Sequence, residues 1–418
     1  MSMKKPKIRF KGYTEDWEQR KLGDMAEIVG GGTPSTSVAS YWDGNIDWYA
    51  PAEIGEQIYL KSSQRKITED GLNKSSAKIL PVGTVLFTSR AGIGKTAILL
   101  KEGCTNQGFQ SIVPDKEKLD SYFIFARSEE LKKYGETVGA GSTFVEVSGK
   151  QMANMGLMMP KMIDEQQKIG AYFYTLDHLI ALHQRKCNQA KKFKKYMLQK
   201  MFPQNGEKNP EIRFGGFTDD WEQRKLGEMC TIITKQTGFD YSATIKPSLV
   251  TTKEDDTYSF IQNKDFEGMN INLDTDFYIP ISVAEKYPKI TLDQPSLLIS
   301  ISGRIGNIGL YSLDSKAFIG GAVGICKLKD IEDGKTTLYE LLSPAGQKYF
   351  NSLIKASSHA NITVEDIRNI EVLLPKHDEE KKRINIYFEN LDHLITLHQR
   401  KCDELKKIKK FMLQNMFV

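Results

Sequence analysis

The sequence predicts an α+β protein in which two pseudo-symmetric globular modules are joined by two long antiparallel coiled-coil helices. Three observations lead to this prediction. The sequence contains an internal repeat of two copies. Each copy starts with short apolar runs separated by glycine-rich turns and ends in a long segment with heptad spacing. We place the first module at residues 1–160, a central helix and linker at 161–205, the second module at 206–375 and a C-terminal helix at 376–418.

Two pairs of near-identical segments define the repeat. Residues 8–25 read IRFKGYTEDWEQRKLGDM and residues 212–229 read IRFGGFTDDWEQRKLGEM, an offset of 204. Further along, LDHLIALHQRKC at 176–187 recurs as LDHLITLHQRKC at 391–402, an offset of 215. The second copy therefore holds eleven more residues than the first. We expect these residues before about position 340, where the second module should differ most in shape.

Each copy ends in a segment that we expect to be one long helix, at 164–201 and at 379–416. Pro160 and Pro375 stand just upstream, where a helix can begin but cannot continue. Strict 4-3 spacing predicts coiled-coil packing, and a helix of this length spans roughly 57 Å. We call the heptad-spaced stripe of each helix its seam. The two helices most simply pair through their seams, and they run antiparallel if the modules lie at opposite ends. The apolar seam residues are Ile169, Phe173, Leu176, Ile180, Ile384, Phe388, Leu391 and Ile395.

Short strands and helices alternate in the modules themselves. The apolar runs at 83–88 and 296–301 predict buried strands, and the segments 119–134 and 337–350 predict helices packed on them. Trp42, Trp48 and Tyr49 are predicted to lie in the core.

Composition excludes several classes of protein. With 40% hydrophobic and 27% charged residues, the 418-residue chain can bury a sizeable core, and it contains no apolar run long enough for a membrane span. Its basic start lacks the apolar stretch of a secretion signal. Five scattered cysteines suit reduced thiols, so we expect a cytoplasmic protein. The net charge of +5 hints at a polyanionic partner.

Two short patterns resemble catalytic motifs. The segment 89–96, SRAGIGKT, resembles a phosphate-binding loop, but Ser89 stands where the first glycine belongs, so we favour a β-turn with a basic side chain. Asp115, Glu130 and Lys132 resemble the carboxylates and lysine of a magnesium-dependent nuclease. Glu130 and Lys132 lie in a predicted helix, where residues two apart do not face each other. The chain also contains no adjacent prolines, so it lacks the loop with which amino-methyltransferases grip a flipped adenine. We therefore predict no catalytic residues.

Histidine and cysteine recur together on the predicted seam. His183 and Cys187 are four residues apart, as are His398 and Cys402. Crossing helices could bring these four residues together as zinc ligands, but a polar layer that fixes the register is the interpretation we favour. We therefore predict no metal site. His178 and His393 are predicted to be exposed.

The order and duplication of these motifs resemble the specificity subunit of a type I restriction–modification system, over essentially the whole chain. The matching segments are DWEQRKLG at 16–23 and 220–227, GGTPS at 31–35, the glycine turns near Gly92 and Arg304, GST at 141–143, LMMP at 157–160 and EQQKI at 165–169. The second copy departs from this pattern with EEKKRI at 379–384 and SSH at 357–359.

This resemblance implies a division of labour. Each module would be a target recognition domain that reads one half of a bipartite, asymmetric site on double-stranded DNA. The paired helices would space the half-sites and dock the methylation subunits, of which we expect two. Those subunits would modify adenine at N6, and a separate restriction and translocase subunit would cut DNA. S-adenosylmethionine, ATP and magnesium are expected on the partner subunits, and this chain is expected to bind no cofactor and no membrane. The alternatives are a magnesium-dependent nuclease and a coiled-coil scaffold without DNA specificity.

Polar residues beside the glycine turns are the candidate DNA-binding residues, because such side chains on loops can reach base edges or phosphates. The candidates are Arg90, Lys95, Asn106, Gln107, Ser142 and Thr143 in the first module and Arg304, Asn307, Ser357, His359 and Asn361 in the second. Trp17 and Trp221 are identical in both copies and are expected to be structural anchors, since readers of different bases would differ. The lysine-rich runs at 191–195 and 406–410 either contact phosphates or an acidic partner, or form a solvated helix face.

Overall fold

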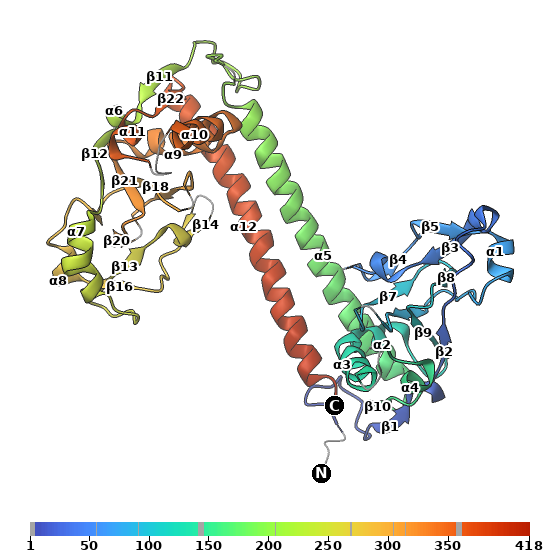
Figure 1. The fold of residues 1–418 in the computed structure, drawn as a ribbon. Coiled ribbons are helices and arrows are strands. Elements are labelled where there is room, and N and C mark those ends of the chain that lie inside the picture. The colour runs from blue at the N-terminus through green and yellow to red at the C-terminus, as the bar shows by residue number, and fades with distance from the viewer. Residues whose placement is uncertain are drawn as a thin grey trace. The chain divides into compact units, whose positions relative to one another are not determined.

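The computed structural model describes residues 5–418, apart from 56, 91, 141–145, 205, 268–269, 304, 314 and 357–361. The chain divides into two compact units. Unit 1 comprises Met1–Gln184 and Gln399–Val418, and unit 2 comprises Arg185–His398. The two long helices, α5 (Ile163–Lys200) and α12 (Asp378–Asn415), each contribute one part to either unit (Figure 1). Both begin and end within one residue of the predicted bounds.

Unit 1 is built on a five-stranded sheet in the order β2-β9-β6-β7-β4. Its strands are β2 (Ala26–Gly30), β9 (Gln110–Pro114), β6 (Val85–Phe87), β7 (Thr96–Leu99) and β4 (Tyr59–Leu60). A three-stranded sheet holds β5 (Arg65–Ile67), β3 (Trp42–Tyr49) and β8 (Cys104–Thr105), and β1 (Glu18–Lys21) pairs with β10 (Gly156–Met159). The helices are α1 (Glu69–Asn73), α2 (Ser121–Ala126), α3 (Ser128–Gly139) and α4 (Gly149–Ala153).

Unit 2 is built on two four-stranded sheets, β12-β21-β18-β19 and β16-β13-β20-β17. The first holds β12 (Cys230–Lys235), β21 (Val323–Leu328), β18 (Ser296–Ser300) and β19 (Ile308–Tyr311). The second holds β16 (Tyr278–Pro280), β13 (Thr257–Ile261), β20 (Ala317–Ile319) and β17 (Thr291–Leu292). Two strand pairs are β11 (Glu222–Lys225) with β22 (Glu371–Leu374) and β14 (Phe266–Glu267) with β15 (Asn270–Ile271). The helices are α6 (Leu226–Met229), α7 (Gly238–Asp240), α8 (Ile281–Ala284), α9 (Ile331–Leu342), α10 (Pro344–Ala356) and α11 (Val364–Arg368).

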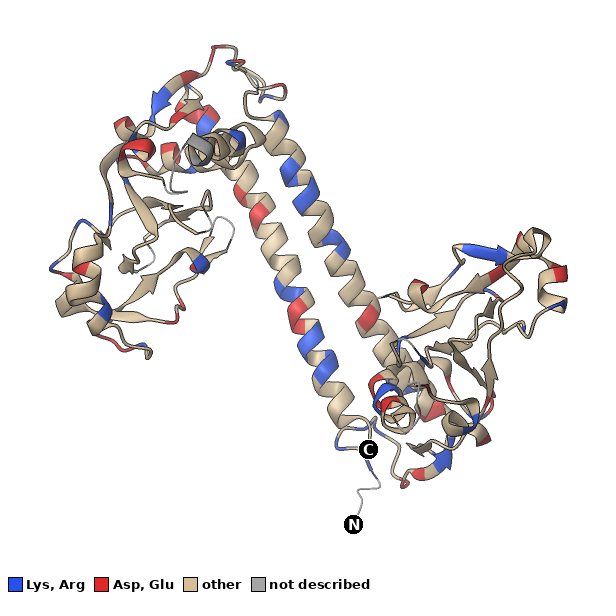
Figure 2. Cartoon of the chain, viewed as in Figure 1, with Lys and Arg blue, Asp and Glu red and all other residues tan. Residues whose placement is uncertain are grey.

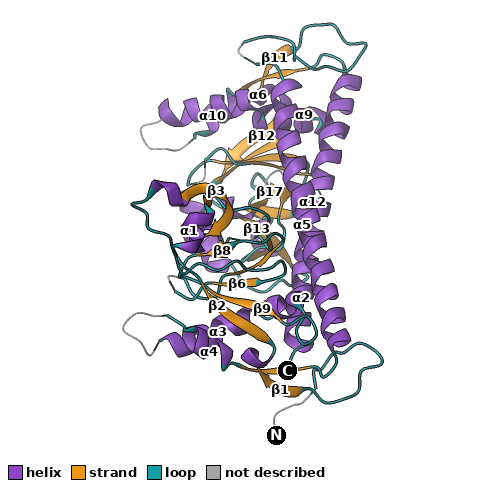
Figure 3. Ribbon diagram, turned by 90° about the vertical axis from the view of Figure 1, so that its right-hand side faces the viewer, coloured by secondary structure: helices purple, strands orange, loops and turns teal. Residues whose placement is uncertain are grey.

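The two units share one topology, although their module sequences differ strongly. The strand order β2-β9-β6-β7 recurs as β12-β21-β18-β19, and β5-β3-β8 recurs as β16-β13-β20, with the same parallel and antiparallel neighbours. Each unit mixes helices and strands, as the α+β prediction requires (Figure 3). Met25 and Met229 are 204 positions apart, whereas Tyr49 and Ile261 are 212 apart at equivalent strand ends. Most of the extra residues therefore lie between β12 and β13, where Gly238–Asp240, Tyr241–Ile245 and Lys246–Ser248 are helical.

Two predicted helices are each divided in the structure, so the prediction of one continuous helix was wrong in both places. The segment 119–134 forms α2 and α3, which meet at Arg127. The buried guanidinium of Arg127 donates to the carbonyl oxygen of Met158 at 2.7 Å and to Glu130. The segment 337–350 breaks between α9 and α10, because Ser343 precedes Pro344 and has extended backbone angles.

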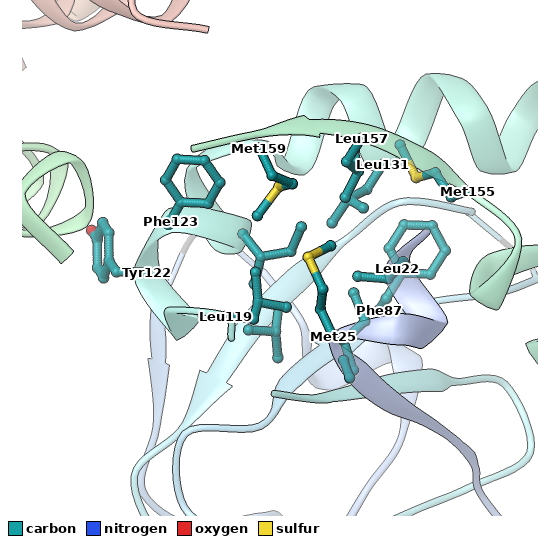
Figure 4. Packing of buried hydrophobic residues seen from close by; sticks show 14 of the residues in the cluster. Leu22, Met25, Phe87, Leu119, Tyr122, Phe123, Leu131, Met155, Leu157 and Met159 are labelled. Carbon is teal, nitrogen blue, oxygen red and sulfur yellow. The ribbon is translucent and has the colours of Figure 1, made fainter. Parts of the chain in front are cut away.

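The core of unit 1 lies between the main sheet and helices α2 to α4. Leu22, Met25, Phe87, Leu131 and Leu157 point toward one another there (Figure 4). The end of α12 completes this core, since Phe417 stacks on Phe173 with ring centroids 5.7 Å apart. In unit 2 the corresponding Phe202, just beyond α5, packs on Phe388. Each unit therefore uses the helix end supplied by the other copy of the repeat. The predicted core residues Trp42, Trp48 and Tyr49 are all buried.

The same buried charge motif stands in both units. The guanidinium of Arg9 donates to both carboxylate oxygens of Glu165 at 2.6 and 2.8 Å, and Trp17 Nε1 donates to Glu165 at 3.3 Å. In unit 2, Arg213 and Trp221 make the same contacts to Glu380, at 2.7, 2.9 and 3.3 Å. Trp17 and Trp221 are each 2% exposed, so the expectation that they are structural anchors is confirmed.

Within each unit, segments of α5 and α12 run antiparallel along the predicted seam. In unit 1, Asp177 accepts hydrogen bonds from Tyr122 Oη at 2.9 Å and from Lys409 Nζ at 2.6 Å. In unit 2, Asp392 accepts from Tyr339 Oη at 3.2 Å and from Lys194 Nζ at 2.5 Å. Of the predicted seam residues, Ile169, Phe173, Leu176, Ile384, Phe388 and Leu391 are buried, and Ile180 and Ile395 are partly buried.

The seam cysteines are also buried. Cys187 Sγ donates to the carbonyl oxygen of Ile395 at 3.8 Å, and Cys402 Sγ lies 3.4 Å from Gln184 Oε1. His178 and His393 are exposed, as predicted. In the described part of the chain, no helix is both long and apolar enough to cross a membrane.

Candidate nucleic-acid interface

Four loops meet at one end of the sheets in unit 1. They follow β2, follow β3, connect β6 to β7 and connect β8 to β9. Backbone hydrogen bonds hold them together: Gly32 N–H donates to Thr105 at 2.8 Å, Asn106 N–H to Tyr49 at 3.0 Å and Ser89 N–H to Gly108 at 2.8 Å. We call residues 31–33, 50–51, 88–90, 92–95 and 105–109 the first loop cluster.

Four of the predicted DNA-binding residues lie in the first loop cluster. Arg90 pairs with Glu146 through the backbone, Lys95 ends the β6–β7 turn, and Gln107 is exposed with its Oε1 accepting a hydrogen bond from Thr33. Asn106 Oδ1 accepts from Gly108 N–H at 2.8 Å. Sequence positions far apart are thus brought to one surface. Ser142 and Thr143 lie outside the described residues.

The segment that resembles a phosphate-binding loop is a hairpin turn between β6 and β7. Thr88 Oγ1 donates to the carbonyl oxygen of Gly92 at 2.7 Å, and Gly94 N–H donates back to Thr88 at 3.0 Å. Gly92 and Gly94 have φ angles of +105° and +97°, which side-chain-bearing residues rarely adopt. This confirms the predicted turn.

Unit 2 brings equivalent loops together. Gly320 N–H donates to Ile261 at 2.7 Å, as Asn106 does to Tyr49, and Ile301 N–H donates to Ala322 at 3.0 Å. Asn263 Nδ2 donates to the carbonyl oxygen of Ser302 at 3.1 Å. We call residues 236, 262–263, 301–303, 305–307 and 320–322 the second loop cluster.

One predicted residue of unit 2 can be placed in this cluster. Asn307 takes the position of Lys95, because its carbonyl accepts from Ser300 N–H as that of Lys95 accepts from Thr88 N–H. The same turn position therefore carries a cation in one unit and an amide in the other. Arg304, Ser357, His359 and Asn361 lie outside the described residues.

Sequence reasoning missed Thr33, Gln236 and Asn263. Gln236 follows β12 directly and is 4% exposed, and within the described part of the chain neither of its amide atoms has a hydrogen-bond partner. The signal that could have found it is its place in the repeat, since the Gly31-Gly32 pair of the GGTPS motif directly follows the equivalent strand β2.

The three residues that resemble a nuclease site make separate ion-pair and packing contacts. Glu130 is held by Arg127 through two hydrogen bonds at 2.8 and 2.9 Å, and Asp115 pairs with Lys118 at 2.8 Å. Lys132 packs its side chain against Gly94. Among the residues that the structure describes, no three His, Cys, Asp or Glu side chains are grouped to hold a metal ion.

Basic residues recur along both long helices (Figure 2), and the lysines of the two lysine-rich runs are divided between seam and solvent. Lys194 and Lys409 pair with aspartates of the seam, and burial lowers the pKa of Lys194 although Asp392 opposes this shift. The neighbours Lys191, Lys192, Lys195, Lys406, Lys407 and Lys410 are exposed. Phe193, Tyr196 and Phe411 are exposed beside them. These exposed residues form mixed basic and aromatic helix faces, on unit 2 for α5 and on unit 1 for α12.

Comparison with known proteins agrees with this architecture. The family described as "Type I restriction modification DNA specificity domain" matches residues 14–192 and again 218–407. The MjaIX specificity subunit of Methanocaldococcus jannaschii is 32% identical over 52% of this chain, and the match spans about half of that relative. The MjaVIII specificity subunit of the same organism is 24% identical over 95% of this chain and 91% of its own length.

Solved structures share the fold. A type I restriction–modification S subunit from M. genitalium aligns with a TM-score of 0.66 and 12% identity, covering 99% of both chains. A chain from a structure of the type I restriction–modification system, determined to explain complex assembly and conformational transition, aligns with a TM-score of 0.50 and 19% identity over 97% of this chain and 98% of its own.

Proposed function

Since this chain belongs to the family of type I restriction modification DNA specificity domains, we propose that its two modules read the two halves of a bipartite, asymmetric DNA site. The observation that carries this proposal is the pair of loop clusters. The same backbone frame gathers polar side chains in both units, but the side chains themselves differ, as at Lys95 and Asn307. Equivalent frames with different donors and acceptors suit two different base sequences.

Proteins of this kind are non-catalytic and work in complexes with other subunits and DNA. We propose that this chain directs N6-adenine methylation by two methylation subunits, and cleavage by a restriction and translocase subunit. S-adenosylmethionine, ATP and magnesium would be bound by those partners. The exposed lysines and aromatic residues on α5 and α12 support docking on these helices, because aromatic residues are enriched at protein interfaces and lysines can pair with an acidic surface. All five cysteines are free and buried, which suits the cytoplasm that we propose as the place of action.

Mapping of N6-methyladenine in host DNA tests the proposal. With the chain present, we expect methylation at one motif made of two unequal specified parts separated by unspecified bases. Deleting the chain should remove methylation from this motif while leaving other methylated motifs unchanged, because the partners carry the chemistry but lack sequence recognition. Methylation of the two-part motif that persists after the deletion, or a simple palindrome in place of the two-part motif, would contradict the proposal.

A further inference from the structure

In each loop cluster, the segment that follows the first strand (β2 or β12) crosses a turn that precedes the neighbouring strand (β9 or β21). Glycines and amide residues occupy opposite sides of this crossing in the two units. In unit 1, Gly31-Gly32 follows β2, and Asn106-Gln107 stands in the turn that crosses it. In unit 2 the order is reversed, because Gln236 follows β12 and Gly320-Gly321 stands in the crossing turn. The frames match, since Lys235 pairs with Gly324 as Gly30 pairs with Gln110.

Steric contact explains why glycine occupies one side of each crossing. A Cβ on Gly31 would lie 1.9 Å from the carbonyl oxygen of Asn106, so no side chain fits there while the turn keeps its path. In unit 2, a Cβ on Gly321 would lie 3.3 Å from Gln236 Oε1, which is a tight contact. The first crossing therefore excludes any side chain at Gly31, and at the second the side chain of Gln236 packs against the bare backbone of Gly321.

Gln236 differs from an ordinary buried glutamine because neither its Oε1 nor its Nε2 has a hydrogen-bond partner among the residues that the structure describes. Buried polar groups without partners are rare in folded proteins and costly to keep. Gln236 Oε1 lies beside the bare backbone of Gly321, where a Cβ would stand 3.3 Å away, and the same loop cluster carries the polar residues Ser302, Asn263 and Asn307. Contact with DNA requires the side chain to change rotamer, a motion that side chains make rapidly.

We propose that Gln236 is a specificity-determining residue of the second module and reads an adenine in the major groove. This inference rests on the proposed function. A glutamine amide presents one donor and one acceptor side by side, and adenine is the base whose major-groove edge offers the matching acceptor at N7 and donor at N6. Bound DNA then supplies the partners that the free chain lacks. In unit 1 the corresponding amides are those of Asn106 and Gln107, which lie in the crossing turn and not in the segment after β2.

The test compares base preference among variants assembled with their methylation subunits, by mapping N6-methyladenine motifs on DNA. Gln236→Leu should relax recognition about ten- to a hundredfold at one position of one half-site, because a good bidentate contact discriminates by about this factor. Gln236→Glu keeps the size of the side chain but offers acceptors alone, so it should shift the preference at that position from adenine toward cytosine. The other half-site should stay unchanged in both variants.

Gln347→Leu is the matched control, because Gln347 is a glutamine whose Nε2 already donates to the carbonyl oxygen of Leu341 at 2.9 Å. It should lower the melting temperature and leave the motif unchanged, whereas Gln236→Leu should not lower the melting temperature. If both Gln236 variants are folded and methylate the unaltered motif, the proposed role of Gln236 is wrong. A wild-type motif that is not bipartite would instead overturn the proposed function, and relaxation at one position would still decide the role of Gln236.

Discussion

Replacing Glu165 by alanine is expected to destabilise unit 1 by about 3–5 kcal/mol, because removal of one partner from a buried ion pair leaves the other charge without compensation. The carboxylate of Glu165 accepts two hydrogen bonds from Arg9 and one from the indole of Trp17, and its side chain is 2% exposed. The substitution would therefore leave the guanidinium of Arg9 and the buried indole N–H of Trp17 without the carboxylate that accepts their hydrogen bonds. Glu380→Ala should have an effect of the same size on unit 2, where Arg213 and Trp221 make the same contacts.

Chemical unfolding combined with hydrogen exchange measures these losses separately in the two units. Two neighbouring acidic residues serve as controls. Asp164 precedes Glu165 and is exposed, and Glu379 precedes Glu380, is exposed and pairs with the exposed Arg383. Alanine at either position should cost less than about 1 kcal/mol. Equal effects at the buried and exposed positions would show that the repeated Arg–Glu–Trp motif does not hold the modules to their helices.

Replacing Glu340 by glutamine is expected to stabilise unit 2 at alkaline pH and to change little at pH 5. Burial raises the pKa of Glu340 to about 8, and a hydrogen bond from the backbone N–H of Leu373 only partly opposes this shift. No described residue forms a hydrogen bond with its Oε2. Because the folded state holds the proton more tightly than the unfolded state, the wild type should lose stability as pH rises from about 4.5 to about 8.

The expected loss is about 1.4 kcal/mol for each pH unit in that window, or on the order of 3–5 kcal/mol in total. Glutamine resembles the protonated acid, so Glu340→Gln should remove this pH dependence. Glu285→Gln is the control, since Glu285 is exposed on the surface of the same unit. Urea unfolding at pH 5, 7 and 9 decides the matter. Parallel stability curves for wild type and Glu340→Gln would contradict the expected titration.

The long helices were predictable because their signal is local and repeated. Heptad spacing, an upstream proline and a second copy all point to the same bounds, and α5 and α12 follow them to within one residue. The breaks inside 119–134 and 337–350 depend on less periodic causes. Ser343 before Pro344 is visible in the sequence, but the break at Arg127 accompanies a contact to Met158, thirty-one positions away.

Some contacts that occur in both units could not be predicted from the sequence repeat. Asp177 and Asp392 are exact counterparts at the offset of 215, as are Lys194 and Lys409. Their tyrosine partners are not, because Tyr122 and Tyr339 are 217 positions apart. The same three-residue contact is thus built from tyrosines at unequal positions on α2 and α9. Aligning the two copies cannot reveal this contact, because the two tyrosines are equivalent in the structure but do not occupy equivalent positions in the repeat.

The candidate site was predicted in part. Reasoning from glycine turns placed Arg90, Lys95, Asn106 and Gln107 correctly on loops, and the structure brings these loops together. Their contact with DNA remains a prediction. Gln236 could not be found this way, because nothing in its local sequence shows that its amide lacks partners. That property belongs to the packed structure, where the amide lies beside Gly321 and has no hydrogen-bond partner in the part of the chain that the structure describes.

Exchange of one module tests the central claim most directly. Residues 15–160 would be replaced by the corresponding module of a relative with a different methylated motif, and N6-methyladenine would be mapped in cells that carry the chimera and its partner subunits. If each module reads its own half-site, one half of the methylated motif changes to that of the donor while the other half remains. A motif in which both halves change, or in which neither changes although the chimera is folded and active, would contradict the account.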